Sequence, residues 1–267
     1  MPNRIPVIMG ITTLPSRIAH MRPCLESLLD GLQVPDKIYI SAPQVSLREK
    51  TGYDIPAFFL ESRFAEKIEI LHPEQDFGPG TKLLGMLGKI TEPSYVVIAD
   101  DDVLYRRFFL RRLIEYQRTD HHASFSWHVY SLAGLRVGQG VDGFSFWSPN
   151  LEGVWDFYET YVAGTDLMFH DDLWISFFLM SRAIPVQTLR FLLEEAGLIN
   201  VRSGEVHDIN ALLNETGNLS RQKLHSLVCP LFARVNVAKE IYGPLLIGKP
   251  DDLCICGSGK LFADCHA

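Results

Sequence analysis

The sequence has no apolar segment long enough to cross a membrane. None of its hydrophobic runs reaches the roughly 18 uncharged residues that a transmembrane helix needs. The first residues, MPNRIPVIMGITTLPSR, contain an apolar run that is too short and too interrupted for a secretory signal peptide. Positive charge is also scarce: the formal net charge is −7, so we expect neither a non-specific polyanion binder nor a nucleic-acid partner. These features favour a cytoplasmic protein.

Cysteine is scarce and unevenly placed. Of the five cysteines, Cys24 and Cys229 are isolated, whereas the other three fall within the last fourteen residues. A disulfide framework would spread its cysteines along the chain, so the pattern indicates another use for the tail. The remaining composition, 47% hydrophobic with 16 Phe, 9 Tyr and 4 Trp, is ample for a large core. We therefore expect a main globular domain over residues 1–247 and a small appendage over residues 248–267.

Segments with strand character and segments with helix character alternate in the first half of the chain. A continuous apolar run predicts a buried strand at residues 6–12, and further strands are predicted at residues 37–41, 67–71 and 95–99. Apolar residues at helical spacing predict helices at residues 18–29, 83–90 and 109–114. Strands that alternate with helices form βαβ units, so the pattern predicts an α/β fold with a mostly parallel sheet.

The segment YVVIADDDVLY ends a predicted buried strand with three adjacent carboxylates, Asp100, Asp101 and Asp102. In open α/β sheets, ligands bind beyond the carboxyl ends of the strands, which is where this triplet falls. One of the three could cap the helix that begins near Arg106, and the others could be solvated turn residues. Capping needs a single oxygen, however, and clustered carboxylates repel one another unless a cation relieves the repulsion. We therefore favour a divalent ion that also binds a phosphate.

A strand that ends in a D-x-D motif resembles the GT-A-fold glycosyltransferases. In that family the motif holds Mn²⁺ or Mg²⁺ on the diphosphate of a nucleotide sugar, and the resemblance gives this role to Asp100 and Asp102. The resemblance also places Asp101 among the residues that bind the nucleotide. The segment TTLPSR after the first strand looks like the family's nucleotide loop, which implies nucleotide contacts for Thr12 and Arg17.

The segment DFGPGTKLLGML is similar to a D-x-G-P-x-x-K segment that precedes the metal strand in some members of the family. Its Gly-Pro-Gly sequence favours an unusual turn. The carboxylate of Asp76 can accept hydrogen bonds from nucleoside hydroxyls, and the ammonium of Lys82 can face a phosphate. The alternative for Lys82 is a solvated lysine in the first turn of a helix.

A second acidic pair, Asp171 and Asp172, comes directly before a helical apolar pattern in GTDLMFHDDLWISFFLM. An acidic pair at this place in the resembling enzymes supplies the catalytic base, although Glu is commoner there than Asp171. We favour Asp172 as the base that deprotonates an acceptor hydroxyl, with Asp171 as its neighbour or as an acceptor-binding group. The alternative is that one of them caps the helix. The resemblance also implies a distant His ligand for the metal, for which His207 is the candidate and His170 the competitor.

The last residues, DDLCICGSGKLFADCHA, closely resemble the SEC-C motif, a short zinc-binding tail. The motif implies Zn²⁺ bound by Cys254, Cys256, Cys265 and His266, a ligand set typical of a closed structural site. A unit this small cannot bury a core, so the metal would supply its folding energy. In proteins that carry this motif the tail binds a macromolecule, which implies a docking role here.

Together these features predict a glycosyltransferase that uses Mn²⁺ or Mg²⁺ to move a sugar from a nucleoside diphosphate, with UDP favoured, to an unknown acceptor hydroxyl. One alternative is a nucleotidyltransferase, although TTLPSR lacks the glycines of a phosphate loop. The other is an inactive domain that acts as an adaptor through the zinc tail. Intact acidic sites argue against that second alternative.

Overall fold

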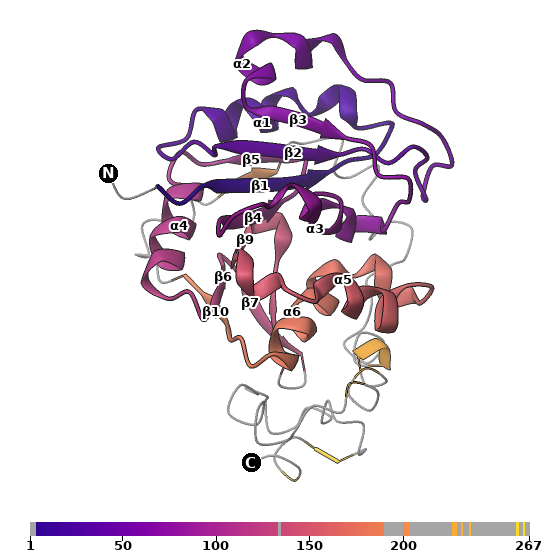
Figure 1. Ribbon diagram of the computed structural model, residues 1–267, viewed down its shortest axis with the longest axis vertical. Helices are drawn as coiled ribbons and strands as arrows, with labels where there is room; N and C mark the ends of the chain where they lie inside the picture. Colours follow the sequence, from indigo (N-terminus) through magenta and orange to yellow (C-terminus); the bar gives the residue numbers. More distant parts are fainter. Residues whose placement is uncertain are drawn as a thin grey trace.

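A seven-stranded sheet with the order β10-β6-β9-β4-β1-β2-β3 forms the centre of the molecule in the computed structural model (Figure 1). The structure describes residues 4–132, 135–189, 200–202 and 226–228, and the single residues 231, 235, 260, 261 and 264. The strands of the sheet are β1 (Val7–Thr12), β2 (Lys37–Ser41), β3 (Ile68–Leu71), β4 (Tyr95–Ala99), β6 (Ser124–Ser126), β9 (Phe144–Trp147) and β10 (Val186–Thr188). Two antiparallel pairs accompany it: β5 (Val103–Tyr105) with β11 (Asn200–Arg202), and β7 (Val129–Leu132) with β8 (Leu135–Gly138).

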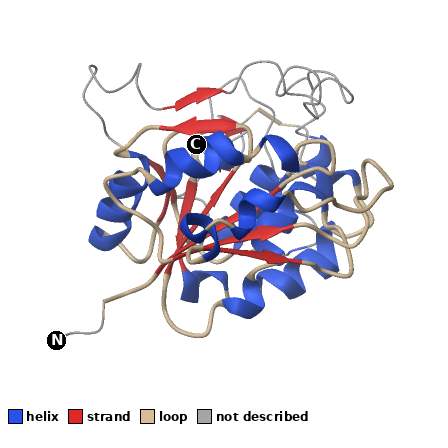
Figure 2. Cartoon of the chain, turned by 90° about the horizontal axis from the view of Figure 1, so that it is seen from above, coloured by secondary structure: helices blue, strands red, loops and turns tan. Residues whose placement is uncertain are grey.

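Helices lie on both sides of this sheet (Figure 2). They are α1 (Arg22–Leu29), α2 (Ser62–Ala65), α3 (Thr81–Leu84), α4 (Phe109–Thr119), α5 (Val154–Phe157) and α6 (Asp171–Ser181). Successive side chains of β1 and β4 point to opposite faces, so they divide the core into two layers. Met9 and Val97 pack with α1 and α4, whereas Ile8 and Val96 pack in the layer that contains α3 and α6. A sheet buried on both faces explains why β1 and β4 read as continuous apolar runs.

The predicted strands at 37–41 and 95–99 have the predicted bounds, and β1 and β3 each begin one residue later than predicted. The helix predicted over residues 83–90 is wrong as a single element. It is divided into α3 and a 3-10 turn at Leu87–Lys89. Gly85, a poor helix former, lies between them, and a Cβ there would lie 2.4 Å from the hydroxyl oxygen of Ser41.

The direction of the strands places a switch point between β1 and β4. β1 pairs in parallel with both β2 and β4, β3 continues on the β2 side, and β9 runs antiparallel to β4 and β6. The sheet is therefore mostly parallel, which confirms the predicted fold class. The chain leaves β1 toward β2 and later returns to the other side of β1 as β4. In such sheets a crevice opens at the carboxyl ends of the two strands where the order reverses.

No helix within the described ranges is long and apolar enough to span a bilayer.

Candidate active site

A pocket of about 400 Å³ lies at this switch point, beyond the carboxyl ends of β1 and β4. Thr12 and Thr13 enter it from β1 and the loop that follows, and the triplet Asp100 to Asp102 enters it from the end of β4. The charged side chains that line it are Arg17, Arg48, Lys82, Asp76, Asp100, Asp101, Asp102, Asp171 and Asp172, together with His170. Six carboxylates therefore face three cationic side chains, which gives a formal charge of −3 when His170 is neutral.

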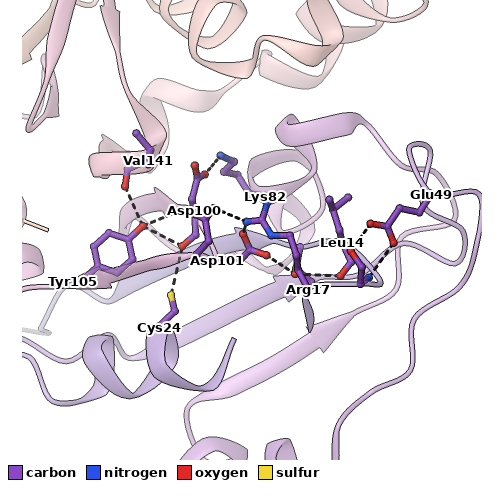
Figure 3. Close-up of polar contacts among 12 residues, drawn as sticks. Leu14, Arg17, Cys24, Glu49, Lys82, Asp100, Asp101, Tyr105 and Val141 are labelled. Atoms are coloured by element: carbon purple, nitrogen blue, oxygen red, sulfur yellow. Dashed lines mark hydrogen bonds and ion pairs between the residues drawn. The ribbon is translucent and has the colours of Figure 1, made fainter. Parts of the chain in front are cut away.

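The triplet is tied to the loop after β1. Arg17 forms ion pairs with Asp101 and with Asp102, whose Oδ2 lies 3.2 Å from the guanidinium Nη2. Thr13 Oγ1 donates a 2.5 Å hydrogen bond to Asp101 Oδ2. Asp101 and Asp102 are buried, whereas the side chain of Asp100 is 31% exposed. Asp101 thus holds Arg17 in place (Figure 3). Asp100 is the most accessible carboxylate of the three.

Lys82 joins the triplet to the second acidic pair. Its Nζ lies 2.5 Å from Asp100 Oδ1 and 3.0 Å from Asp171 Oδ2, and the residue is only 4% exposed. Burial alone would lower the pKa of Lys82, but the charges of Asp100, Asp171 and Asp172 outweigh it and raise the pKa above its ordinary value. The ammonium group is therefore charged at neutral pH. Its burial excludes the alternative of a solvated first-turn lysine.

The backbone of Asp100 is held by Tyr105, from the end of β5. The Tyr105 hydroxyl accepts a 2.9 Å hydrogen bond from Asp100 N and lies 3.1 Å from Asp100 O and 3.2 Å from Val141 O (Figure 3). Cys24 Sγ, from α1, lies 3.5 Å from the same Asp100 carbonyl. Burial raises the pKa of Cys24 to about 12, so this thiol is protonated. The turn that presents the triplet is therefore fixed by contacts from separate elements.

Asp171 and Asp172 form the first turn of α6, and neither caps it. The N-cap is His170, and no side chain accepts a hydrogen bond there. Asp172 Oδ1 instead accepts a 2.8 Å hydrogen bond from Gly140 N. Burial, and then the charge of Asp171, raise the pKa of Asp172 well above its ordinary value, although Lys82 acts in the opposite direction. The capping alternative is also wrong for the triplet, because α4 begins at Phe109 with no side-chain cap.

Asp76 organises the loop that leads to Lys82. Its Oδ1 accepts hydrogen bonds from Gly78 N at 2.8 Å and from Thr81 Oγ1 at 3.0 Å, and its Oδ2 accepts one from Leu47 N at 2.7 Å. Gly78 has a φ of +63°, a conformation that favours glycine and explains its place in the Gly-Pro-Gly turn. Asp76 lines the pocket, but these loop contacts use much of its hydrogen-bonding capacity, and its contact with nucleoside hydroxyls stays a prediction.

Several residues of the site were not predicted. Thr13, Tyr105 and Gly140 hold Asp101, Asp100 and Asp172, respectively. The sequence carries weak signals for two of them: Thr13 stands in the segment TTLPSR, and Tyr105 closes the segment YVVIADDDVLY. Gly140 contributes only its backbone N–H, so its side chain gives no sign of this role.

The donor groups of the pocket fit a hard divalent cation that shares its ligands with a phosphate. Among the described residues, no three His, Cys, Asp or Glu side chains form a group that could hold a metal ion alone. Mg²⁺ and similar ions are commonly held by only one or two protein carboxylates when substrate phosphates supply further oxygens. Arg17 Nε is buried and has no hydrogen-bond partner among the described residues, which suits an incoming anion.

His207, the predicted metal ligand, lies outside the described residues, and so do Cys254, Cys256, Cys265 and His266. The competitor of His207, His170, lines the pocket directly before Asp171.

The fold matches a solved glycosyltransferase. The mannosyltransferase PcManGT of Pyrobaculum calidifontis superposes with a TM-score of 0.50 and 13% identity, over 90% of this chain and 74% of that protein. The chain has the GT-A fold. At this identity the likeness shows the fold alone.

Other GT-A structures match less closely. TarS of S. aureus aligns with a TM-score of 0.49 and 11% identity, over 88% of this chain and 44% of that protein. GlyE of Streptococcus pneumoniae gives 0.44 and 14%, over 70% and 46%. No curated protein sequence matches this chain. The tail is a SEC-C motif, because the model of that family matches residues 252–267.

Proposed function

We propose that this protein is a metal-dependent glycosyltransferase that moves a sugar from a nucleoside diphosphate to an acceptor hydroxyl. The charge of the pocket is the observation that carries the proposal. A pocket whose formal charge is −3 with all six carboxylates ionised repels a nucleoside diphosphate unless a divalent cation binds with it. The GT-A fold supports the same reading, because PcManGT was solved with GDP-Man and Mn²⁺.

Asp100 and Asp102 would hold the metal ion, with His207 as the proposed third ligand. A divalent ion bound there neutralises charge on the leaving diphosphate. Arg17 offers its buried, unpartnered Nε to a phosphate oxygen, and Lys82 supplies a second cation that contacts Asp100. Thr12 and Asp76, which also line the pocket, would contact the nucleoside.

Asp172 would act as the base on the acceptor side of the pocket. It takes the proton of the acceptor hydroxyl while the hydroxyl oxygen bonds to the anomeric carbon. The bond from that carbon to the diphosphate breaks, and its electron pair leaves with the diphosphate. A carboxylate whose pKa is raised is a stronger base once deprotonated, and Gly140 N fixes its orientation. Asp171 pairs with Lys82, whose ammonium group therefore lies between the triplet and the pair Asp171 and Asp172.

Calorimetric titration of UDP and then GDP, with Mn²⁺ and with EDTA, tests the proposal. We expect one of the two nucleotides to bind only with metal. Replacing Asp102 with alanine should weaken this binding by about tenfold or more, a change of about 1.4 kcal/mol or more. Asp156→Ala is the matched control, because Asp156 is exposed on α5 and does not line the pocket.

Two results would contradict the proposal. If neither nucleotide binds in the presence of Mn²⁺, the UDP and GDP donors are excluded, and an adaptor role for the zinc tail gains support. If a nucleotide binds equally well to wild type and to Asp102→Ala, the metal ligands are wrongly assigned. Once the base is known, a series of nucleotide sugars with that base identifies the donor.

A further inference from the structure

The side-chain amide of Gln139 is a polar group of the pocket that the proposed chemistry does not use. Gln139 lines the pocket and is half-buried. Its backbone N–H donates to the His128 carbonyl at 3.2 Å, and its carbonyl accepts from Ser126 Oγ at 3.1 Å. Within the described part of the chain, its side-chain amide has no hydrogen-bond partner. An amide carries both donor N–H groups and an acceptor oxygen, so it can bind hydroxyl groups in either role.

The backbone directs this amide to the face of the β7–β8 hairpin that carries Tyr130. Gln139 directly follows β8 and has extended dihedral angles, with φ at −108° and ψ at 119°. Side chains two residues apart in an extended chain share a face, so Gln139 points the same way as Val137. Val137 is paired with Tyr130 of β7, and paired residues of antiparallel strands also share a face. Tyr130 lines the pocket too, so this face of the hairpin is the one that meets the pocket.

Two hydrogen bonds on either side of Gln139 attach this segment to α6. Gly138 N donates to Ser176 Oγ at 3.1 Å, and Gly140 N donates to Asp172 Oδ1 at 2.8 Å. Gln139 is therefore held one residue away from the N–H group that orients the proposed base.

Phe169 adds an apolar surface close to the same base. It ends the 3-10 turn Asp166–Phe169, three residues before Asp172, and it lines the pocket. A Cβ at Gly78, another residue of the pocket lining, would lie 3.7 Å from Phe169 Cδ1. The side chain is half-buried, yet it belongs to neither of the two hydrophobic cores that the described residues form. Core packing therefore does not explain an aromatic residue at this position.

We infer that Gln139 and Phe169 bind a sugar ring next to Asp172: the amide hydrogen-bonds to hydroxyls of the sugar, and the phenyl ring packs on its C–H face. A pyranose ring presents an apolar face and a rim of hydroxyls, so its binding site needs both kinds of contact. Neither side chain is charged, which suits a neutral ligand. The ring belongs either to the donor sugar or to a saccharide acceptor. The inference rests on the proposed function, because it concerns the substrates of that reaction.

Gln139→Met and Phe169→Leu test the inference, because they remove the amide and the aromatic ring with little change in size. Three quantities are measured for each variant of the full chain. The first two are the affinities, with Mn²⁺, for the nucleoside diphosphate and for its nucleotide sugar. The third is the rate of diphosphate release with methyl glycosides as probe acceptors.

The pattern of losses identifies the source of the ring. If the ring is the donor sugar, Gln139→Met lowers the affinity for the nucleotide sugar about two- to tenfold and leaves that for the nucleotide unchanged. If the ring is a saccharide acceptor, Gln139→Met leaves both affinities unchanged and raises the KM of the glycoside more than it lowers kcat. Phe169→Leu should change the same quantities in the same direction.

Matched substitutions separate contact with the sugar from folding. Gln187→Met makes the first change at an exposed glutamine of β10, and Phe58→Leu makes the second at a half-buried phenylalanine. Neither residue lines the pocket, so both controls should equal wild type in all three measurements. An unchanged affinity for the nucleotide shows that each test variant is folded.

The inference is overturned if wild type binds nucleotide while both variants equal it for the nucleotide sugar and for every glycoside that wild type uses; the proposed function then stands. It is also overturned if the variants weaken nucleotide and nucleotide sugar equally, because the two residues then support the pocket without contacting the sugar. If wild type binds no nucleotide, the proposed function fails, and this inference fails with it.

Discussion

Lys82 is the residue on which the electrostatics of the pocket depend most. Its ammonium group is buried and contacts Asp100, after β4, and Asp171, at the start of α6. Breaking a buried ion pair by removing one partner is costly, because the remaining charge has lost both water and its counter-ion. Lys82 also competes with any metal ion for Asp100. The same side chain should therefore stabilise the protein without metal and weaken the binding of metal.

We expect Lys82→Met to lower the free energy of unfolding by about 3–5 kcal/mol in EDTA. Added Mn²⁺ should raise the melting temperature of this variant more than that of wild type, because the ion replaces the missing positive charge. Denaturant and thermal unfolding, each with EDTA and with Mn²⁺, measure both effects. Lys89→Met makes the same chemical change at an exposed pair with Glu69, and it should alter neither quantity appreciably. An equal response of the two variants to Mn²⁺ would contradict this account.

Much of this site could be predicted residue by residue, but the contacts within it could not. The triplet, Arg17, Lys82 and the pair Asp171 and Asp172 were predicted at one site, and they line one pocket. That Arg17 and Lys82 neutralise the carboxylates is a property of the folded chain. Thr13 and Asp101, for example, are 88 residues apart in sequence.

The packing of α3 on β1 positions Lys82, and Gly10 makes that packing possible. A Cβ at Gly10 would overlap the carbonyl oxygen of Lys82 and lie 2.7 Å from Met86 Sδ. The helix therefore approaches the strand too closely for any side chain. The apolar pattern PVIMGIT predicts the strand correctly, but it gives no sign of this close approach, because a glycine in a strand has several explanations.

We expect Gly10→Ala to lower the free energy of unfolding by about 1–3 kcal/mol, because an added methyl group overpacks this contact. Nucleotide affinity should fall as well, since α3 carries Lys82 into the pocket. Gly88→Ala is the control: a Cβ there meets no atom within 4 Å, and stability should change by less than about 0.5 kcal/mol. Denaturant unfolding and calorimetry give the two quantities. Wild-type stability in Gly10→Ala would show that α3 can shift away from β1 at no cost.

Two candidate sites lie at separate places along the chain: the pocket and the C-terminal SEC-C motif. The position of the first, at the switch point between β1 and β4, could be predicted because the strand order of an α/β sheet determines where its crevice opens. The second, the SEC-C motif at residues 252–267, is recognised from its sequence. Its ligands lie outside the described residues, so zinc binding and independence from the pocket stay predictions.

We expect the full chain to contain one Zn²⁺, bound by Cys254, Cys256, Cys265 and His266. Cys256→Ser should lose the zinc, whereas Cys229→Ser, a cysteine outside the motif, should keep it. Elemental analysis after gel filtration measures the metal content. If the tail is an appendage to the main domain, Cys256→Ser should also bind nucleotide with Mn²⁺ as wild type does. Retention of zinc by Cys256→Ser would contradict the ligand set, and a loss of nucleotide binding would show that the tail supports the pocket.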